Sequence, residues 1–445
     1  MSEINMDVTA LSRSAVNRVR AKQVGFVLLA LFTNIVNYLD RSTISIGALH
    51  IRADLGLTAV QLGMLLSVWS FSYAICNMPA GFLIDRFGAR YIASGAIFIW
   101  SLAQMAGGVV TGFVPMLVSR LVLGVAESPT APTNAKMVST WIPSRRRGFA
   151  TAVYTSATSM GPFLAPLVLT GLMLQFGWKM MFIGMGAAGV VFAGLYFFLY
   201  RDLNKAKLSD EERKLILGDD VPTPHVPVTF KRWASLFRFR TTWGLMVTAF
   251  CNGWVFWIFA GWLPLYLETE FHMSVAKTGI MAAIPFIGGL FGSLLGGFLS
   301  DWMERRGISK VRSRKIPIIV GTLGLSIFTV VVGVAAVPTV AIVFSFLAVC
   351  FVQMAGTAQW AAVTVLFPKN LVGSAITSSN FAAYLGATFS PIVTGLSVDL
   401  TGSFRSALLL GAAICLIGCI NMLFTVNKVV DEDAIEDALK KRSSE

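Results

Sequence analysis

Charged side chains are scarce in this sequence. Only 13% of its 445 residues are Asp, Glu, Lys or Arg, and 55% are hydrophobic, whereas soluble proteins carry about 25% charged residues. Apolar stretches of 20 residues or more recur along almost the whole chain. Each is long enough to cross the roughly 30 Å hydrocarbon layer of a membrane. These observations exclude a soluble domain and predict an integral membrane protein.

Histidine and cysteine are also rare, which narrows the possible chemistry. The three histidines all fall in predicted loops, so no imidazole is available at membrane depth as a proton carrier. The five cysteines fall in apolar stretches without paired spacing, so we predict neither a disulfide nor a metal site. No nucleophile–base pair or phosphate-binding loop appears in a suitable context. We therefore expect no enzyme activity, no catalytic residue and no cofactor.

Twelve apolar stretches are predicted to span the membrane. They cover approximately residues 24–49, 58–82, 90–110, 113–135, 148–174, 178–200, 242–266, 277–300, 316–336, 338–366, 371–396 and 406–427. The polar stretch 201–241 separates six spans from six. The predicted organisation is therefore a tail (1–22), a six-helix bundle (23–200), a linker with one surface helix (201–241), a second six-helix bundle (242–428) and a tail (429–445).

The distribution of basic residues predicts the orientation in the membrane. If both termini are cytoplasmic, 29 of the 36 Lys and Arg residues fall in inner segments and four in outer loops. This is the bias expected of short cytoplasmic loops. The net charge of +13 could also suggest nucleic-acid binding. Because the basic residues are divided among short loops at the membrane edge, we expect no nucleic-acid partner.

A short motif repeats in the two halves. The sequence "GFLIDRFGAR" (81–90) follows the second span, and "GFLSDWMERR" (297–306) follows the eighth, 216 positions later. One copy alone would be interpreted as an ordinary charged loop. Two copies at matching positions indicate pseudo-symmetric bundles. We expect Gly81 and Gly297 to allow close helix approach, and Asp85 and Asp301 to meet a helix amino terminus or a basic side chain.

Charge inside the predicted spans is confined to the first half. Only Asp40 and Glu127, of 23 acidic residues, lie within spans, and Arg41 and Arg120 are their basic companions. A charged residue at the centre of a membrane helix costs roughly 2.5–3.5 kcal/mol. One interpretation is an internal ion pair that holds spans 1 and 4 together. The other is a water-accessible cavity in which these groups meet a substrate and protons.

Helix spacing indicates which of these groups share a face. Arg120 and Glu127 are seven residues apart, which places them two turns apart on one face of span 4. Tyr38 and Arg41 share a stripe of span 1, and Asp40 lies about 100° around the helix from Arg41. Span 1 can therefore present its guanidinium to a cavity and its carboxylate to a neighbouring helix.

The chain resembles the major facilitator superfamily over residues 22–428. The resemblance is carried by the twelve spans in two halves and by Gly81, Asp85, Arg86, Gly88 and Arg90 after span 2. It implies an all-α fold in which two pseudo-symmetric six-helix bundles, with both termini cytoplasmic, enclose a central site and rock around it. The loop motif carries no information about the substrate.

Three further segments are similar to the anion:cation symporter branch of that superfamily. They are "NYLDR" in span 1, "SRLVLGVAESPTAPTNAKMVSTWIP" in span 4 and "GWLPLYL" (261–267) in span 7. The branch includes carriers of galactonate, glucarate, hexuronates, sialic acid and glutamate. The resemblance implies that Asp40 and Glu127 are protonatable, that Arg41 binds the substrate carboxylate and that Arg120 faces Glu127. It also implies pocket-lining roles for four residues: Tyr38, Tyr73, Trp360 and Asn380.

Two positions depart from the galactonate-type pattern. Thr158 stands where those carriers tend to have a glutamine, and Gln359 stands where they tend to have a smaller residue. We include both, together with Tyr384, among the predicted substrate-binding residues. Trp254 and Trp257 in span 7 are interpreted as packing residues, as most aromatic residues in spans are.

The expected function is proton-coupled uptake of a small organic anion across the inner membrane. Sugar acids (aldonates, aldarates or hexuronates) are the favoured substrates, protons are the coupling ion, and the expected state is a monomer in the lipid bilayer. Aromatic carboxylates remain open as substrates. Two other hypotheses are an anion exchanger without proton coupling and a non-transporting receptor or scaffold. The exchanger leaves two buried acids without a role, and the receptor needs no charged cavity.

Overall fold

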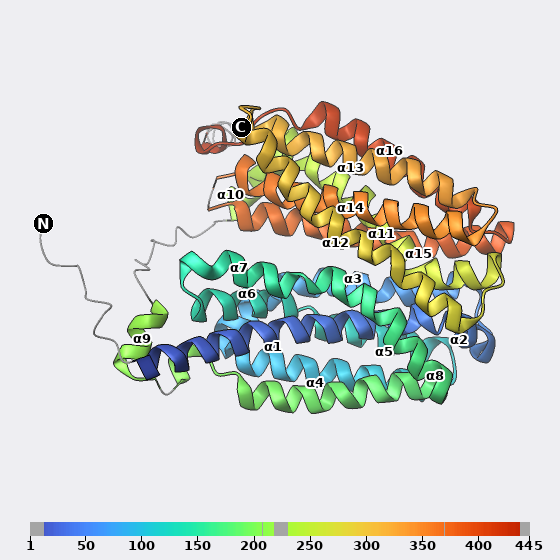
Figure 1. Ribbon diagram of the computed structural model, residues 1–445, viewed down its shortest axis with the longest axis horizontal. Helices are drawn as coiled ribbons and strands as arrows, with labels where there is room; N and C mark the ends of the chain where they lie inside the picture. The colour runs from blue at the N-terminus through green and yellow to red at the C-terminus, as the bar shows by residue number, and fades with distance from the viewer. Residues whose placement is uncertain (1–12, 207, 218–229, 369, 437–445) are drawn as a thin grey trace, which may run out of the picture.

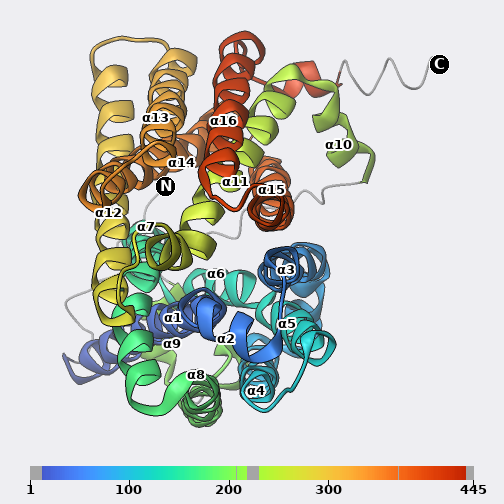
Figure 2. The same cartoon turned by 90° about the vertical axis from the view of Figure 1, so that its right-hand side faces the viewer.

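The helices of this protein lie side by side in two groups along the long axis of the molecule (Figure 1). The structure is a computed structural model, and it describes residues 13–206, 208–217, 230–368 and 370–436. Within these residues the secondary structure is helical, without strands. Viewed along the helices, the two groups form separate bundles that face each other (Figure 2). The beginning of α1 and the end of α16 lie at the same end of the molecule, which supports the predicted topology.

The first bundle contains the first half of the chain. Its helices are α1 (Arg13–Ile46), α2 (Ala48–Leu55), α3 (Ala59–Phe87), α4 (Ala89–Gly107), α5 (Phe113–Glu127), α6 (Thr130–Trp141), α7 (Ser144–Thr155) and α8 (Ala157–Leu199). A kink at Gly177, with φ +78°, divides α8 into two antiparallel parts. Glycine is favoured there because this left-handed backbone is strained for other residues. The kink lies between the predicted spans 5 and 6.

The second bundle follows a linker. Its helices are α11 (Arg240–Glu270), α12 (Val275–Arg305), α13 (Lys310–Gly333), α14 (Pro338–Leu366), α15 (Val372–Thr401) and α16 (Arg405–Thr425). The described linker residues form η2 (Leu203–Lys205), α9 (Asp210–Leu217), α10 (Phe230–Ser235) and η3 (Leu236–Arg238). Glu212 of α9 accepts a hydrogen bond of 2.9 Å from Nε of Arg18, which docks the linker helix against α1.

Nine helices within the described residues are individually long and apolar enough to cross a membrane. One of the nine stretches, 146–199, runs through the kink at Gly177 and so covers two predicted spans. The remaining two predicted spans correspond to α4 and to the pair α5–α6. The arrangement is the predicted all-α membrane fold.

The repeated loops place both aspartates against basic side chains, as expected. Asp85 pairs with Lys136 at 2.7 Å, and Asp301 pairs with Arg314 at 2.9 Å. The expectation for the glycines was wrong. A Cβ atom on Gly81 would meet nothing within 4 Å, and one on Gly297 would meet only a methyl group of Thr357 at 3.9 Å.

The close approach is made instead by Gly296, whose added Cβ would collide with the carbonyl oxygen of Met354 in α14. Neighbouring residues on a helix point about 100° apart, so the packing glycine and the motif glycine face different directions. In the first-half loop, Gly88 (φ +89°) precedes α4, and Asp202 accepts hydrogen bonds from the backbone N–H groups of Ala89 and Arg90. Arg86 packs over the Phe87 ring.

The two bundles are in close contact at the end predicted to face outside. The carboxylate of Asp399 in α15 accepts hydrogen bonds from the backbone N–H groups of Ala59 (2.9 Å) and Val60 (2.8 Å) at the start of α3. Ser45 of α1 donates a hydrogen bond of 2.7 Å to the carbonyl of Gly261 in α11. Gly63 lies against the backbone of Pro391, where a Cβ atom would collide with the carbonyl oxygen. The outer side is therefore closed.

We expect Gly63→Val to hold this outer contact open, because backbone cannot move aside as a flexible side chain can. A cysteine introduced at Ser45, in a background without the native cysteines, should then react with an impermeant maleimide added outside. Gly171→Val is the matched control, since a Cβ at Gly171 meets nothing within 4 Å. Equal labelling in the two variants would contradict this account of the closed side.

Candidate functional site

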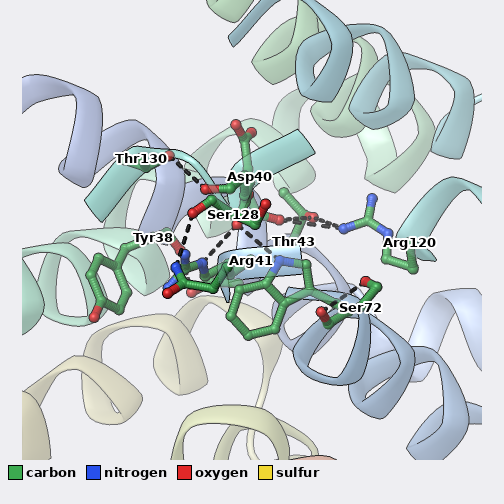
Figure 3. A network of polar contacts seen from close by, with 12 residues as sticks. Tyr38, Asp40, Arg41, Thr43, Ser72, Arg120, Ser128 and Thr130 are labelled. Carbon is green, nitrogen blue, oxygen red and sulfur yellow. Dashed lines mark hydrogen bonds and ion pairs between the residues drawn. The ribbon is translucent and has the colours of Figure 1, made fainter. Parts of the chain in front are cut away.

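The candidate site lies at the middle of the interface between the bundles. Side chains from α1, α3 and α5 form its charged side, as Figure 3 shows. Side chains from α11, α14 and α15 form its uncharged side. The site was expected to be charged only on the side of the first half, and the described residues bear this out.

Arg41 is the centre of the charged side. Its Nε atom donates to Oε2 of Glu127 at 2.8 Å, and the two side chains are only 6% and 0% exposed. The guanidinium also lies over the rings of Trp69 (4.2 Å), Tyr38 (5.0 Å) and Tyr73 (5.0 Å). Stacking on aromatic faces stabilises a desolvated cation. The aromatic residues thus hold Arg41 in one orientation.

Glu127 is positioned by a break in span 4. It is the last residue of α5, and α6 begins at Thr130. Pro129, which has no N–H group, interrupts the backbone hydrogen bonds between the two helices. Irregular backbone at this depth is tolerated where it lines a cavity or is buried in protein. Oε2 of Glu127 also accepts a hydrogen bond of 2.8 Å from the indole of Trp69, whereas Oε1 has no partner in the described structure.

The pairing predicted for Glu127 requires correction. Its ion pair is made with Arg41 and not with Arg120. Arg120 donates instead to Oε1 of Gln104 at 2.8 Å and packs over the ring of Phe182. The bridge between spans 1 and 4, considered as an alternative to a functional cavity, is thus present as Arg41–Glu127, and it lies at the cavity itself.

Asp40 points away from Arg41, as Figure 3 shows. Its side chain is fully buried, and neither carboxylate oxygen has a hydrogen bond in the described part of the chain. The nearby polar groups include Arg120, Glu127 and the indole N–H of Trp100. A buried carboxylate without donors is costly unless it gains a proton or a partner. This arrangement is suited to a group that exchanges a proton.

Two adjoining cavities occupy the interface. The first, of about 40 Å³, is lined by Arg41, Trp69 and Arg120, and the second, of about 200 Å³, by residues of α11, α14 and α15. They share three lining residues, Tyr38, Phe256 and Trp257. The terminal nitrogens of Arg41 make no hydrogen bond within the described residues, although they lie at the wall of the first cavity. They remain available to a ligand.

The second cavity is walled by amides and aromatic rings. Asn252, Gln353, Trp360, Asn380 and Tyr384 all line it. Both amide atoms of Asn252 are buried without a hydrogen-bond partner in the described structure, which favours a role in binding a polar ligand. Trp360 is 52% exposed near the inner end of α14, so the cavity is accessible from the inner side.

Not every predicted residue lies where it was expected. Gln359 lines the second cavity, but its Nε2 donates to the carbonyl of Leu245 and joins α14 to α11. Thr158 is exposed and lines neither cavity. Tyr73 is buried behind the wall, with its ring 4.7 Å from that of Tyr384.

Sequence reasoning missed the role of two tryptophans. Trp257 was interpreted as a packing residue, yet it lines both cavities. Trp69, which holds Glu127, was not singled out at all. Its spacing of four residues from Tyr73 places the two rings on one face of α3, and this pattern could have identified it. Trp254 is buried in the core, as interpreted.

The sequence model of the Major Facilitator Superfamily matches residues 30–312, which is more than half of the chain. The chain belongs to this superfamily. A probable L-galactonate transporter of Escherichia coli (strain K12) is 35% identical, with 93% of this chain and 92% of the relative aligned. A hexuronate transporter of Bacillus subtilis (strain 168) is 30% identical, covering 93% of this chain and 97% of the relative.

Solved structures share the fold. A bacterial homolog of the human lysosomal transporter Spinster, in an inward-facing and occupied conformation, matches 90% of this chain and 96% of its own, with a TM-score of 0.75 at 18% identity. The superfamily member described here is a multi-pass transporter of the inner membrane and not an enzyme.

Proposed function

We propose that this transporter takes up a sugar acid together with protons. The observation that carries the proposal is Arg41, whose terminal nitrogens are unpaired in the described structure at the wall of a central cavity. A planar guanidinium binds a carboxylate through two parallel hydrogen bonds. The names of the two relatives, an L-galactonate and a hexuronate transporter, support a sugar acid as the ligand.

The amides opposite Arg41 suit the remainder of such a ligand. A sugar acid has one carboxylate and several hydroxyl groups, which can both donate and accept hydrogen bonds. The side chains of Asn252, Gln353 and Asn380 offer amide donors and acceptors to the second cavity. Tyr384 and Trp360 add flat surfaces against which a sugar backbone can pack. We assign the carboxylate to Arg41 and the hydroxyl groups to the second bundle.

Proton coupling follows from competition for Arg41. In the empty site Glu127 already occupies Nε of the guanidinium. A proton on Glu127 removes the negative charge that competes with the substrate, and a proton on Asp40 neutralises the other buried acid. The loaded site then carries Arg41 and the substrate carboxylate as one compensated pair, beside Arg120, whose positive charge is held by a hydrogen bond to Gln104. Such a site can be buried while the bundles rock, and release to the inside returns both protons to water.

An aromatic carboxylate is the second candidate substrate. Trp69, Trp257, Trp360 and Tyr384 line the two cavities with aromatic rings. A planar aromatic ring could stack against these side chains while its carboxylate binds Arg41. The difference between the two candidates lies in the amides of the second bundle, which an aromatic ring would leave unpaired.

A screen for thermal stabilisation separates these candidates. A ligand that binds only the folded protein raises its melting temperature, so purified protein should be heated with L-galactonate, galacturonate, glucarate, benzoate and phthalate. We expect the sugar acids to stabilise it and neutral galactose to have no effect. Uptake into vesicles with an imposed proton gradient should follow the same order. Stabilisation by benzoate alone would favour the aromatic candidate.

Asn252 and Asn380 should determine specificity without determining the need for a carboxylate. Replacing either by Ala removes hydrogen bonds worth about 1–3 kcal/mol to a buried ligand, or roughly 5- to 150-fold in affinity. The loss should be large for a polyhydroxylated acid and small for a deoxy analogue of the same length.

Isothermal titration with both ligands measures this difference. Asn427→Ala, at an exposed position beyond α16, is the matched control. A variant that bound neutral sugars as well as sugar acids would refute the division of roles between the two bundles.

A further inference from the structure

A third cavity lies inside the first bundle, away from the interface. It is enclosed by α1, α4, α6 and α8, and its lining includes Trp100, Thr133, Asn134 and Tyr196. About 10 Å³ is open to the centre of a water molecule, on the order of the space that one buried water needs. The cavity is separate from the two at the interface, because none of its lining residues lines either of them.

Three polar atoms at this cavity lack partners in the described structure. They are Nε1 of Trp100, Oγ1 of Thr133 and the hydroxyl of Tyr196, on side chains that are at most 1% exposed. Buried polar groups are normally hydrogen-bonded, and a buried water typically satisfies two to four of them. Three unpaired groups from three helices around one small space therefore indicate a water site.

Two of the lining residues, Trp100 and Thr130, lie next to the segments that carry the buried acids, although neither acid lines the cavity itself. The Trp100 indole faces the Asp40 carboxyl group, although the two do not meet the distance and angle of a hydrogen bond. Arg41, Arg120 and Glu127 are the charged groups around Asp40. Thr130, another lining residue, donates to the backbone carbonyl of Glu127 at 2.7 Å.

The inner end of the cavity approaches the cytoplasmic edge of the bundle. Tyr196 lies one turn before the end of α8, and its ring is 5.7 Å from that of Tyr200. Asp202 follows at the start of the linker, half-buried, where it caps α4. Lining residues 93–100 of α4 span about 10 Å along the helix axis. The residues that line the cavity thus reach from Trp100, which faces Asp40, to Ala93 and Tyr196 nearer the inner end of the bundle.

We propose that this cavity holds an ordered water and forms, with Thr133 and Tyr196, a proton path from Asp40 to Asp202 that is separate from the substrate cavity. The proposal rests on the proton coupling proposed above. The carboxyl O–H of Asp40 gives its proton to the water that Trp100 orients. This water then passes a proton to the hydroxyl groups of Thr133 and Tyr196 and becomes neutral again. Asp40 becomes a carboxylate, each hydroxyl group that accepts a proton donates its own onward, and the carboxylate of Asp202 accepts the last proton and releases it into the cytoplasm.

Trp100 and the hydroxyl residues have different roles in this path. An indole N–H only donates, so Trp100 orients the water and does not relay a proton. A hydroxyl group both accepts and donates, so Thr133 and Tyr196 can pass a proton onward. The path runs within the first bundle, and none of the residues that line it lines the substrate cavities.

The test removes the two hydroxyl groups while keeping the shape of both side chains. In the double variant Thr133→Val, Tyr196→Phe, neither change breaks a hydrogen bond to the described protein, so folding should be retained. Infrared spectroscopy of purified protein in mildly acidic buffer can follow the protonated Asp40 carbonyl band, identified by its loss in Asp40→Asn. After transfer to D₂O, exchange of this proton should be at least about 10-fold slower than in the unmodified protein.

The matched control is Thr329→Val, Tyr91→Phe, which deletes the same groups away from the cavity and should exchange at the normal rate. An unchanged rate in the double variant would overturn the path while leaving proton coupling intact. Absence of any protonated Asp40 band in the unmodified protein would instead refute the proposed coupling, and the path with it. If the double variant fails to melt cooperatively, Thr133→Val alone decides the question by the same comparison.

Discussion

Arg41→Lys is expected to abolish most substrate binding although it keeps the positive charge. Lysine presents a single ammonium group, so it cannot hold Glu127 through Nε and a carboxylate through the two terminal nitrogens at the same time. Loss of one charge-assisted hydrogen bond corresponds to about 1.5–3 kcal/mol, or roughly 10- to 150-fold in affinity. Titration calorimetry with the best ligand from the thermal screen measures this change.

Arg405→Lys is the control for this substitution, because Arg405 is exposed at the start of α16 on the outer side.

Glu127→Gln tests the partner of Arg41 in the same site. If substrate binding requires a proton on Glu127, affinity in the unmodified protein rises as the pH falls. The glutamine variant should lose much of that dependence and bind well at neutral pH. Near-normal affinity in Arg41→Lys would exclude Arg41 as the carboxylate ligand.

Asp40→Asn is expected to abolish accumulation of substrate against its gradient. The amide has nearly the shape of the protonated acid but cannot release a proton, so the coupled step is lost. Arg41 points away from Asp40 and keeps its contacts, so binding and substrate exchange between the two sides should persist. The accumulation ratio in vesicles with an imposed proton gradient should therefore fall to about one.

Exposed Asp433→Asn should leave uptake unchanged, and a protonophore should collapse uptake in the unmodified protein to the level of Asp40→Asn. The decisive measurement is the pair of assays together, uphill uptake and exchange at equal concentrations. If Asp40→Asn vesicles still concentrated substrate when a proton gradient was imposed, Asp40 would not be the coupling site. The exchanger hypothesis would then be favoured.

Hydropathy was sufficient to predict the fold, and the rare charges were sufficient to identify the buried charged cluster between the bundles. Long apolar stretches require helices in a membrane because every backbone group must be paired internally. Charged side chains are costly at membrane depth, so those within predicted spans stood out: Asp40, Arg41, Arg120 and Glu127. The structure places all four near the middle of the interface or behind it. These signals depend on composition along one helix, which a sequence displays directly.

Which side chains pair between helices was harder to predict from the sequence. Both arginines could reach Glu127 by spacing alone, and the choice of Arg41 depends on how α1 and α5 are rotated against each other. The break at Pro129 was visible as a proline within an apolar stretch, but span 4 was predicted to be continuous. The wrong expectation for Gly297 also arises from the rotation of one helix against another. Gly296 and Gly297 are adjacent in sequence, yet only one faces α14 closely, because each residue turns the helix by about 100°.

The ion pair between Arg41 and Glu127 has a consequence for how fast the transporter returns when no substrate is bound. A binding site with an uncompensated guanidinium would resist burial, and the bundles could then return only with a second anion bound, as in an exchanger. Here a carboxylate of the protein takes the position of a counter-ion when the ligand has left. On the proposed mechanism, the unloaded carrier therefore returns without a second anion, and we expect each cycle to give net uptake of substrate. Strengthening this internal partner would speed the return and weaken substrate capture, so turnover and affinity should change in opposite directions across substitutions of Trp69, which holds Glu127 in place.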